Sequence, residues 1–354
     1  TYVDITIASS GSPEVMIITS SKEVTSIDVS KKVVLNGMVS LKGDSCNATW
    51  RMNGKSLLLN TLTPVFTTVS SGVPRIVSLV LSENSLFERT KLVFSLTCKD
   101  IVSSITVSTN GSPLPGLFTI SPSYGDELTT LFMFSGVQWS DQDLPLTYMF
   151  GFNSAGENMI IQGRSELSFG ESVLPSGQES VSFKVTCSLL VYDSLGSSTL
   201  STASVIVTRI STAVLESKIK LQLSSLSNNN DATKKVLSTA SIALNQENSS
   251  SDVVTKIAIR DSLINNLSSL TQNEDPSIDT ISTWASNLGA ITKKTDEISP
   301  YLAKSAQNIA ETILDGVIST SISYDTISNI LKVCDASIIN NHRRRLETTS
   351  MDNI

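Results

Sequence analysis

The feature of this sequence that most restricts its fold is a single change in hydrophobic period near Arg209. Before this residue, apolar and polar residues alternate in short runs, which is the period of a half-buried β-strand. After it, apolar residues recur every three or four positions, as they do in an amphipathic helix. We therefore expect a β-sheet N-terminal part followed by an α-helical C-terminal part.

Residues 1–109 are predicted to form an all-β domain. Runs rich in Val, Ile, Leu and Thr alternate with turn residues, and seven such strands are typical of a β-sandwich. The strands are expected at 3–8, 14–20, 31–41, 46–52, 74–81, 91–99 and 103–108. Cys46 and Cys98 fall within two of them, so we expect a disulfide that joins the two sheets; two free buried thiols are the alternative. Such a bridge would stabilise the fold by about 4 kcal/mol.

Residues 110–210 are predicted to form a second sandwich. The segment 183–187 repeats the pattern of 94–98, and a Val/Ile-rich strand follows both. We interpret this as an internal repeat, which predicts two tandem sandwiches of the fibronectin-type-III or Ig kind. Cys187 is expected either to remain a free buried thiol or to pair with Cys334 in the helical part.

Residues 211–340 are predicted to form a bundle of six amphipathic helices. Helix starts are indicated by Asp231, by Asp275-Pro276, by Ser299-Pro300 and by Asp325. Residues 341–354 are expected to be a charged tail. It contains the only histidine, His342, and the run Arg343–Arg345, which is a processing site, a charged linker or a solvated tail.

Composition and targeting signals narrow the class of protein. The net charge of −7 argues against a nucleic-acid partner, because binding phosphate needs a basic face. The sequence shows no signal peptide and no apolar run long enough to cross a bilayer, so it is expected to be a piece of a longer protein, with any membrane anchor outside it. Four Asn-x-Ser/Thr sequons are candidate N-glycan acceptors if the chain is secreted: Asn47, Asn110, Asn248 and Asn266. Pro113 disfavours the second of them.

No catalytic constellation is predicted. The only histidine lies in the tail, where it has no buried position from which to act as a base. Neither a phosphate-binding loop nor a CxxC pair occurs. Asp141 and Asp143 are the sharpest candidates for a function, as weak Ca²⁺ ligands. Because Ca²⁺ takes six or more oxygens, we favour the alternative that they cap a turn near Trp139. No cofactor is therefore expected, apart from this Ca²⁺ alternative.

One stretch resembles a known family. It reads Gly116-x-Phe-x-Ile-Ser-Pro, then Gly125-x-x-Leu-Thr-Thr-x-Phe, then Trp139-x-Asp-x-Asp-Leu-Pro-Leu-x-Tyr-x-Phe-Gly-Phe. These residues are similar to the signature of the REJ (receptor for egg jelly) module of polycystin-like cell-surface proteins. In that family the REJ region leads into a GAIN domain whose first part is helical, so the resemblance implies a GAIN-A-like bundle here. The sequence contains no autoproteolysis motif.

The resemblance implies a non-catalytic segment, extracellular or at the cell surface, in adhesion, ligand recognition or ciliary mechanosensing. Its expected partners are other protein chains, and the ciliary membrane is the narrower expected location. The alternative is a structural subunit of an extracellular filament or ciliary surface hair (mastigoneme-like), in which modules pack head to tail. A lectin-like sandwich is disfavoured because aromatic residues make up only 5% of the chain.

Overall fold

The computed structural model describes residues 13–18, 26–57, 60–154, 156–226, 229–246, 253–317, 327–328 and 330–331. Its contacts divide the chain into two compact units, Thr1–Pro113 with Tyr192–Ser198, and Leu114–Val191 with Thr199–Ile354. The first boundary lies close to the expected one at 109. The expected boundary at 210 does not separate units, because the second sandwich and the helices belong to one unit. The expected strand at 3–8 lies outside the described residues.

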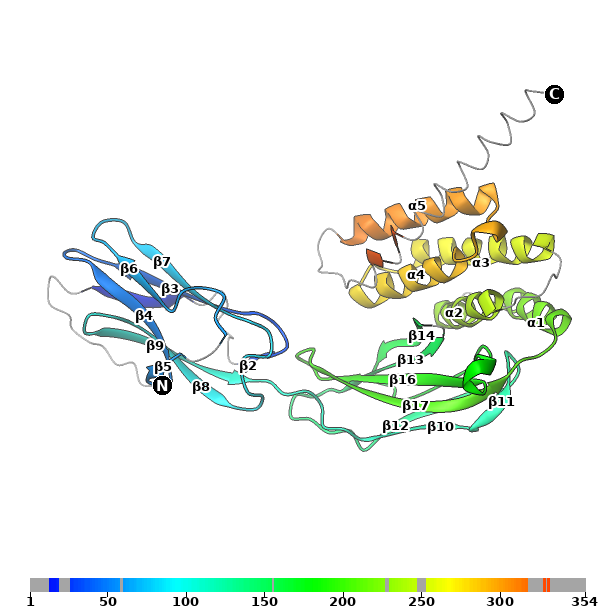
Figure 1. The fold of residues 1–354 in the computed structure, drawn as a ribbon, viewed down its shortest axis with the longest axis horizontal. Coiled ribbons are helices and arrows are strands. Elements are labelled where there is room, and N and C mark those ends of the chain that lie inside the picture. The colour runs from blue at the N-terminus through cyan, green and yellow to red at the C-terminus, as the bar shows by residue number, and fades with distance from the viewer. Residues whose placement is uncertain are drawn as a thin grey trace, which may run out of the picture. The chain divides into compact units, whose positions relative to one another are not determined.

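The first unit is a β-sandwich (Figure 1). One sheet has the order β1-β3-β7; the other has the order β2-β9-β8-β4-β5, with β6 also paired to β4. The strands are β1 (Glu14–Ile18), β2 (Ser26–Ile27), β3 (Val33–Ser40), β4 (Cys46–Met52), β5 (Lys55–Ser56), β6 (Phe66–Val69), β7 (Arg75–Leu81), β8 (Lys91–Cys98) and β9 (Ile101–Thr109).

The core of the first unit follows from the alternation of the strands. Along β3 every second residue, beginning with Val33, is buried, as period-2 patterning requires. Trp50 on β4 and Phe94 on β8 are fully buried between the sheets. Both belong to a core cluster that draws residues from the two sheets, such as Leu35 and Leu79 from the other one.

The disulfide between Cys46 and Cys98 is present, with the Cα atoms 5.8 Å apart and a sequence separation of 52. The expectation that it joins the two sheets is wrong. Cys46 lies on β4 and Cys98 on β8, and these two strands are antiparallel neighbours in one sheet. Period-2 counting predicts which face of a strand a cysteine lies on, but it does not predict which strands pair.

The second unit begins with another sandwich. One sheet has the order β10-β12-β15, and the other β11-β17-β16-β13-β14, in which β11 runs parallel to β17. The strands are β10 (Leu117–Ser121), β11 (Tyr124–Asp126), β12 (Phe132–Val137), β13 (Thr147–Ser154), β14 (Glu157–Ser165), β15 (Phe169–Ser172), β16 (Lys184–Tyr192) and β17 (Ser198–Thr208), with a short 3-10 helix η1 (Glu179–Val181).

A helical layer follows and lies along the five-stranded sheet (Figure 1). Both α2 and α4 contact β14. The helices are α1 (Thr212–Ser224), α2 (Asn230–Gln246), α3 (Val253–Asn273), α4 (Ile278–Ile291) and α5 (Pro300–Val317), with the 3-10 helix η2 (Thr295–Glu297) before α5. Of the sixth expected helix, only residues 327–328 and 330–331 are described; Ile330 is buried in the helical core.

The helix starts agree with the sequence at two positions and differ at one. Ser277 and Thr280 form a capping box at the start of α4, directly after Asp275-Pro276. Ser299 Oγ accepts a hydrogen bond from the Leu302 N–H at 2.9 Å, so it caps α5. The cap of α2 is Asn229 rather than Asp231. The Asn229 side chain accepts from the N–H groups of Asp231 and Ala232.

Candidate functional site

The segment that resembles the family signature forms the centre of the second sandwich. Phe150 on β13 packs against Phe118 of the facing sheet, with ring centroids 6.1 Å apart, and against Phe134 at 5.9 Å. All three rings, and Trp139, are buried in one core cluster. Gly116 is required by close packing, since a Cβ there would lie 2.2 Å from the Val137 carbonyl oxygen. This part of the signature is therefore structural.

The second part of the signature joins the sandwich to the helices. The turn from Asp126 to Thr130 (the 126–130 turn) is held by hydrogen bonds between these two residues, from Asp126 N–H to Thr130 Oγ1 at 2.9 Å and from Thr130 N–H to Asp126 O at 3.0 Å. Leu128 has a positive φ of 48° and is 2% exposed. Its side chain belongs to the core of the helical layer, together with Leu215 and Ile219 of α1.

A chain of polar side chains supports the same joint. Ser176 Oγ donates to Gln246 Oε1 at 2.9 Å, and Gln246 Nε2 donates to Ser154 Oγ at 2.6 Å. Arg209, which directly follows β17, donates to the Gln246 carbonyl oxygen at 3.3 Å. The C-terminal end of α2 is thereby tied to β13, to the segment before η1, and to the linker into α1.

A buried ion pair lies inside the helical layer. The Arg260 side chain on α3 is fully buried, and its Nε donates a hydrogen bond to Glu297 Oε2 at 2.7 Å. Its Nη2 forms an ion pair with the same oxygen, also at 2.7 Å. It also donates to the Ile291 carbonyl oxygen at 2.8 Å and to Asn245 Oδ1 at 3.0 Å. Burial lowers the pKa of the Arg260 guanidinium, and the charge of Glu297 opposes that effect. Lys256 Nζ lies 3.8 Å from Glu297 Oε1.

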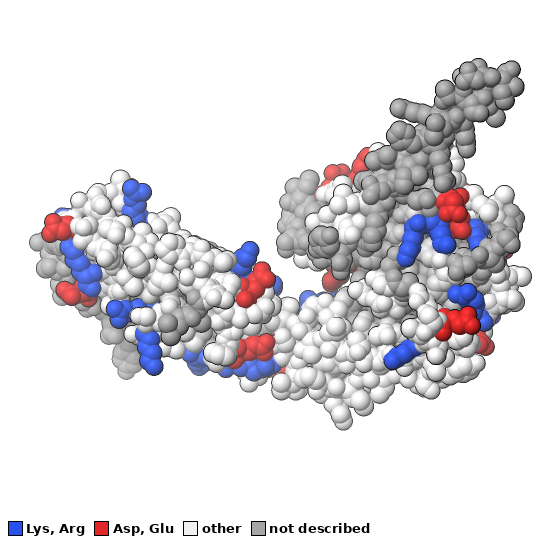
Figure 2. Space-filling view, viewed as in Figure 1, with Lys and Arg blue, Asp and Glu red and all other residues white. Residues whose placement is uncertain are grey.

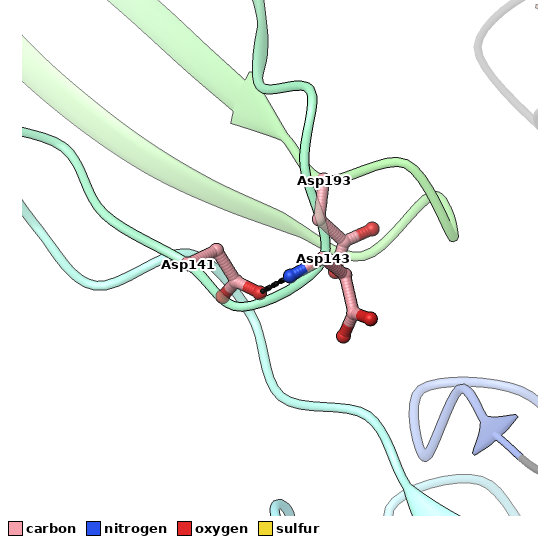
Figure 3. Close-up of side chains that lie close together, drawn as sticks. All are labelled: Asp141, Asp143 and Asp193. Atoms are coloured by element: carbon pink, nitrogen blue, oxygen red, sulfur yellow. Dashed lines mark hydrogen bonds between the residues drawn. The ribbon is translucent and has the colours of Figure 1, made fainter.

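The two Ca²⁺ candidates lie on one turn (Figure 3). Asp141 Oδ1 accepts a hydrogen bond from the Asp143 N–H at 2.9 Å, which is the turn-capping role favoured from the sequence. Their carboxylate oxygens lie within 4.8 Å of each other. Two carboxylates supply only part of the six to eight oxygens that Ca²⁺ takes, and the Ca²⁺ alternative stays a prediction.

Figure 3 also draws Asp193, which the contacts place in the first unit. It is fully buried and organises the turn between β16 and β17: Oδ1 accepts from the N–H groups of Leu195 and Ser197, both at 2.9 Å. Oδ2 accepts from Asn110 Nδ2 at 2.6 Å. A turn role is expected for an aspartate shortly before a glycine, but the buried amide partner is not predictable from the local sequence.

The contact between Asn110 and Asp193 corrects one of the four predicted glycan acceptors. Asn110 is 3% exposed, and its amide nitrogen, the atom that would carry a glycan, donates to Asp193. A glycan on Asn110 does not fit the folded unit. Asn47 is exposed on β4, Asn266 is partly exposed on α3, and Asn248 lies outside the described residues.

Of the two remaining cysteines, the structure describes Cys187. Cys187 on β16 is a free and fully buried thiol. Burial raises the pKa of this thiol to about 12, so it stays protonated and unreactive at neutral pH. The alternative of a bridge from Cys187 is therefore wrong for this structure. Cys334 lies outside the described residues.

An exposed apolar surface covers the outer side of the β10-β12-β15 sheet. We call it the apolar face and define it by Leu117, Met133, Val137, Leu167 and Phe169, whose side chains are 42–61% exposed. Leu117 lies opposite Val137, and Ser135 lies opposite Phe169 across the ladder. Much of the second unit's surface in Figure 2 likewise carries neither basic nor acidic residues. Thr119, Ser121 and Ser135 lie on the same side of the sheet, between these apolar side chains. Exposed apolar side chains gathered on one side of a sheet indicate an interaction site.

The comparison with protein families identifies the chain. The model of the REJ domain matches residues 1–250, well over half of the sequence, so the chain belongs to the REJ family. The match includes both sandwiches and continues through α2. No curated protein matches the sequence.

Solved structures with distant similarity include an adhesin, a tandem from titin and a set of Ig domains. A Ca²⁺-stabilized adhesin that helps an Antarctic bacterium bind ice has 13% identity and a TM-score of 0.34, covering 55% of this chain and 49% of the adhesin. The I9–I11 tandem of titin has 10% identity and a TM-score of 0.27, and the match covers 55% of this chain and 66% of the titin tandem. The N-terminal eight Ig domains of Down Syndrome Cell Adhesion Molecule have 11% identity and a TM-score of 0.30, and the match covers 55% of this chain and 24% of that one. The chain thus spans about half the length of the adhesin.

Among the described helices, none combines the length and apolar character that a membrane crossing requires. Family membership and the Cys46–Cys98 disulfide fit an extracellular module that is not an enzyme.

Proposed function

We propose that the chain is a non-catalytic segment of a polycystin-like cell-surface protein and that it acts in adhesion or ligand recognition. Support comes from membership of the REJ family and from a disulfide, which is typical of oxidising compartments. On this proposal the helical layer corresponds to the first, helical part of a GAIN domain. Ciliary mechanosensing is the narrower form of the proposal, and N-glycans are expected on Asn47 and Asn266.

The observation that carries the adhesive role is the apolar face. Four large apolar side chains stand on one side of the three-stranded sheet, and Leu167 lies just before β15; Glu171 is the charged residue on the same side. Protein interfaces are depleted in charge at their centres and enriched in aromatic residues and methionine, as this face is. A protein surface is therefore the expected partner, and burial of Met133 and Phe169 would contribute most of the binding energy.

The test uses the whole chain immobilised on beads. We expect wild-type beads to bind to cells that display the same protein, or to one another, and Met133→Glu/Phe169→Glu beads to lose that binding. The matched control is Leu200→Glu, since Leu200 is 58% exposed on β17, outside the apolar face. Equal adhesion of all three bead types would contradict the role of the face.

The second candidate function is that of a subunit in an extracellular filament or ciliary hair. It requires that copies of the purified chain assemble with one another in solution. Sedimentation velocity of the natively purified chain separates the two. Large assemblies that dissociate in the Met133→Glu/Phe169→Glu variant favour the filament, and monomers favour the receptor segment. Intact mass with and without glycosidase and reductant tests the secretory assignment, and a mass without glycan or disulfide would contradict it.

A further inference from the structure

A buried carboxylate lies where the second sandwich meets the helical layer. Glu127 is 1% exposed and occupies the 126–130 turn, directly before Leu128, whose side chain belongs to the helical core. Its own N–H donates to the Thr208 carbonyl oxygen at the end of β17, at 2.9 Å. Any free-energy change at this carboxylate therefore acts on the contact between the two layers.

The carboxylate is poorly satisfied as an anion. Oε1 accepts from the Ser176 N–H at 3.0 Å. Oε2 is buried and accepts no hydrogen bond of normal length and angle from the described residues. An ionised carboxylate offers about four acceptor positions, and leaving them unused in a buried site is costly. Burying the neutral acid costs less free energy, because it carries one proton and no net charge.

The charges around Glu127 do not remove this cost. Arg209, on the linker after β17, is the charged side chain that acts on the Glu127 carboxylate. The Arg209 guanidinium also donates a hydrogen bond to the Gln246 carbonyl oxygen at the end of α2. Asp126, on the same turn, accepts from Thr208 Oγ1 at 2.6 Å. The exposed Glu179 of η1 lines a cavity of about 340 Å³ together with Arg209.

Lys293, two residues after α4, is a further basic side chain that lines this cavity. The segment 173–177 has no ionisable side chain, and α2 ends in Asn245 and Gln246. Burial is the largest influence and raises the pKa of the Glu127 carboxyl above its ordinary value. The hydrogen bonds of Ser176, the N–H of Ile210 and the charge of Arg209 lower it only in part.

We propose that the 126–130 turn is a pH-sensitive latch, which holds the second sandwich to the helical layer more tightly when Glu127 is protonated. The direction follows from linkage. Because the raised pKa belongs to the folded state, the contribution of Glu127 to stability is complete below the ordinary value of 4.5 and is lost as the pH rises through the raised value. Each pKa unit of that increase multiplies the equilibrium constant for opening about tenfold at neutral pH.

The test is Glu127→Gln in the full chain, because the amide is a neutral shape match for the protonated acid. Unfolding in urea is followed by helical circular dichroism, which reports the second unit, between pH 4.5 and 8. We expect the glutamine variant to be more stable than the wild type at pH 7.5 and its stability to depend less on pH. Amide hydrogen exchange of Leu128 and Ser176, corrected for intrinsic rates, should be slower in the variant at pH 7.5.

The matched control is Glu166→Gln, which removes the same charge from an exposed turn before β15 and should leave the pH dependence of stability unchanged. The proposal is overturned if Glu127→Gln is less stable than the wild type at pH 7.5, or if it fails to fold. It is also overturned if the variant keeps the wild-type pH dependence, or if Glu166→Gln changes that dependence equally.

Discussion

Replacing Arg260 with methionine tests how the helical layer is held together. The guanidinium is fully buried and makes hydrogen bonds to three groups: Glu297, the Ile291 carbonyl oxygen and Asn245. Methionine fills a similar volume but donates no hydrogen bond. The substitution therefore leaves a carboxylate, a carbonyl and an amide oxygen without their donor inside the protein.

The structure sets the expected size of the effect. Breaking a buried ion pair by removing one partner costs about 3–5 kcal/mol, because the remaining charge is left uncompensated. Lys256 stays near Glu297, but its 3.8 Å distance is too long for a good hydrogen bond. We therefore expect Arg260→Met to lower the free energy of unfolding of the second unit by about 3–5 kcal/mol. Adding Glu297→Gln removes the stranded charge and should restore about 1–2 kcal/mol of that loss.

The assay is urea unfolding followed by circular dichroism at a helical wavelength, with wild type, both single variants and the double variant measured at one pH. The first unit has no described α-helix, so the signal reports the second unit. The reasoning would be refuted by a loss below about 1 kcal/mol for Arg260→Met, or by a double variant whose loss equals the sum of the two single losses.

Three further predictions concern the joint, the disulfide and the glycans. Leu128→Ala should destabilise the second unit by about 2–5 kcal/mol, whereas Leu131→Ala, at a 51% exposed neighbour, should have little effect in the same urea assay. Replacing Cys46 and Cys98 with alanine should destabilise the first unit by about 4 kcal/mol in the chain-entropy model for a separation of 52, measured by the fluorescence of buried Trp50; a loss below about 1 kcal/mol would contradict it. Glycopeptide mapping after secretory expression should find a glycan on Asn47 and none on Asn110.

Local patterns predicted the elements well where one face of each element meets a core. The alternation of β3 and the inward Phe150 and Phe94 follow from period 2, and the caps at Ser277 and Ser299 follow from local hydrogen bonding. The order of strands and helices along the chain was predictable for the same reason. Each of these features depends on residues close in the sequence.

Pairing between distant segments was not predictable in this way. The disulfide lies within one sheet because β4 and β8 are neighbours, and the strand pattern of either one does not specify its partner. Arg260 lies four residues before Ile264 and seven before Leu267, on the apolar face of its helix, which was a readable signal for a buried charge. Its acceptors, however, come from segments 31 and 37 residues further along the chain and from Asn245, 15 residues before it.

The 126–130 turn also has a consequence for how such modules spread between proteins. The family match does not stop at the last strand but continues to residue 250, just beyond α2. A sandwich transferred alone would carry Leu128 without the α1 residues that cover it. The protein that received it would therefore expose an apolar surface prone to unwanted association. We therefore expect recombination to move these strands together with the helices that follow them, as one heritable piece.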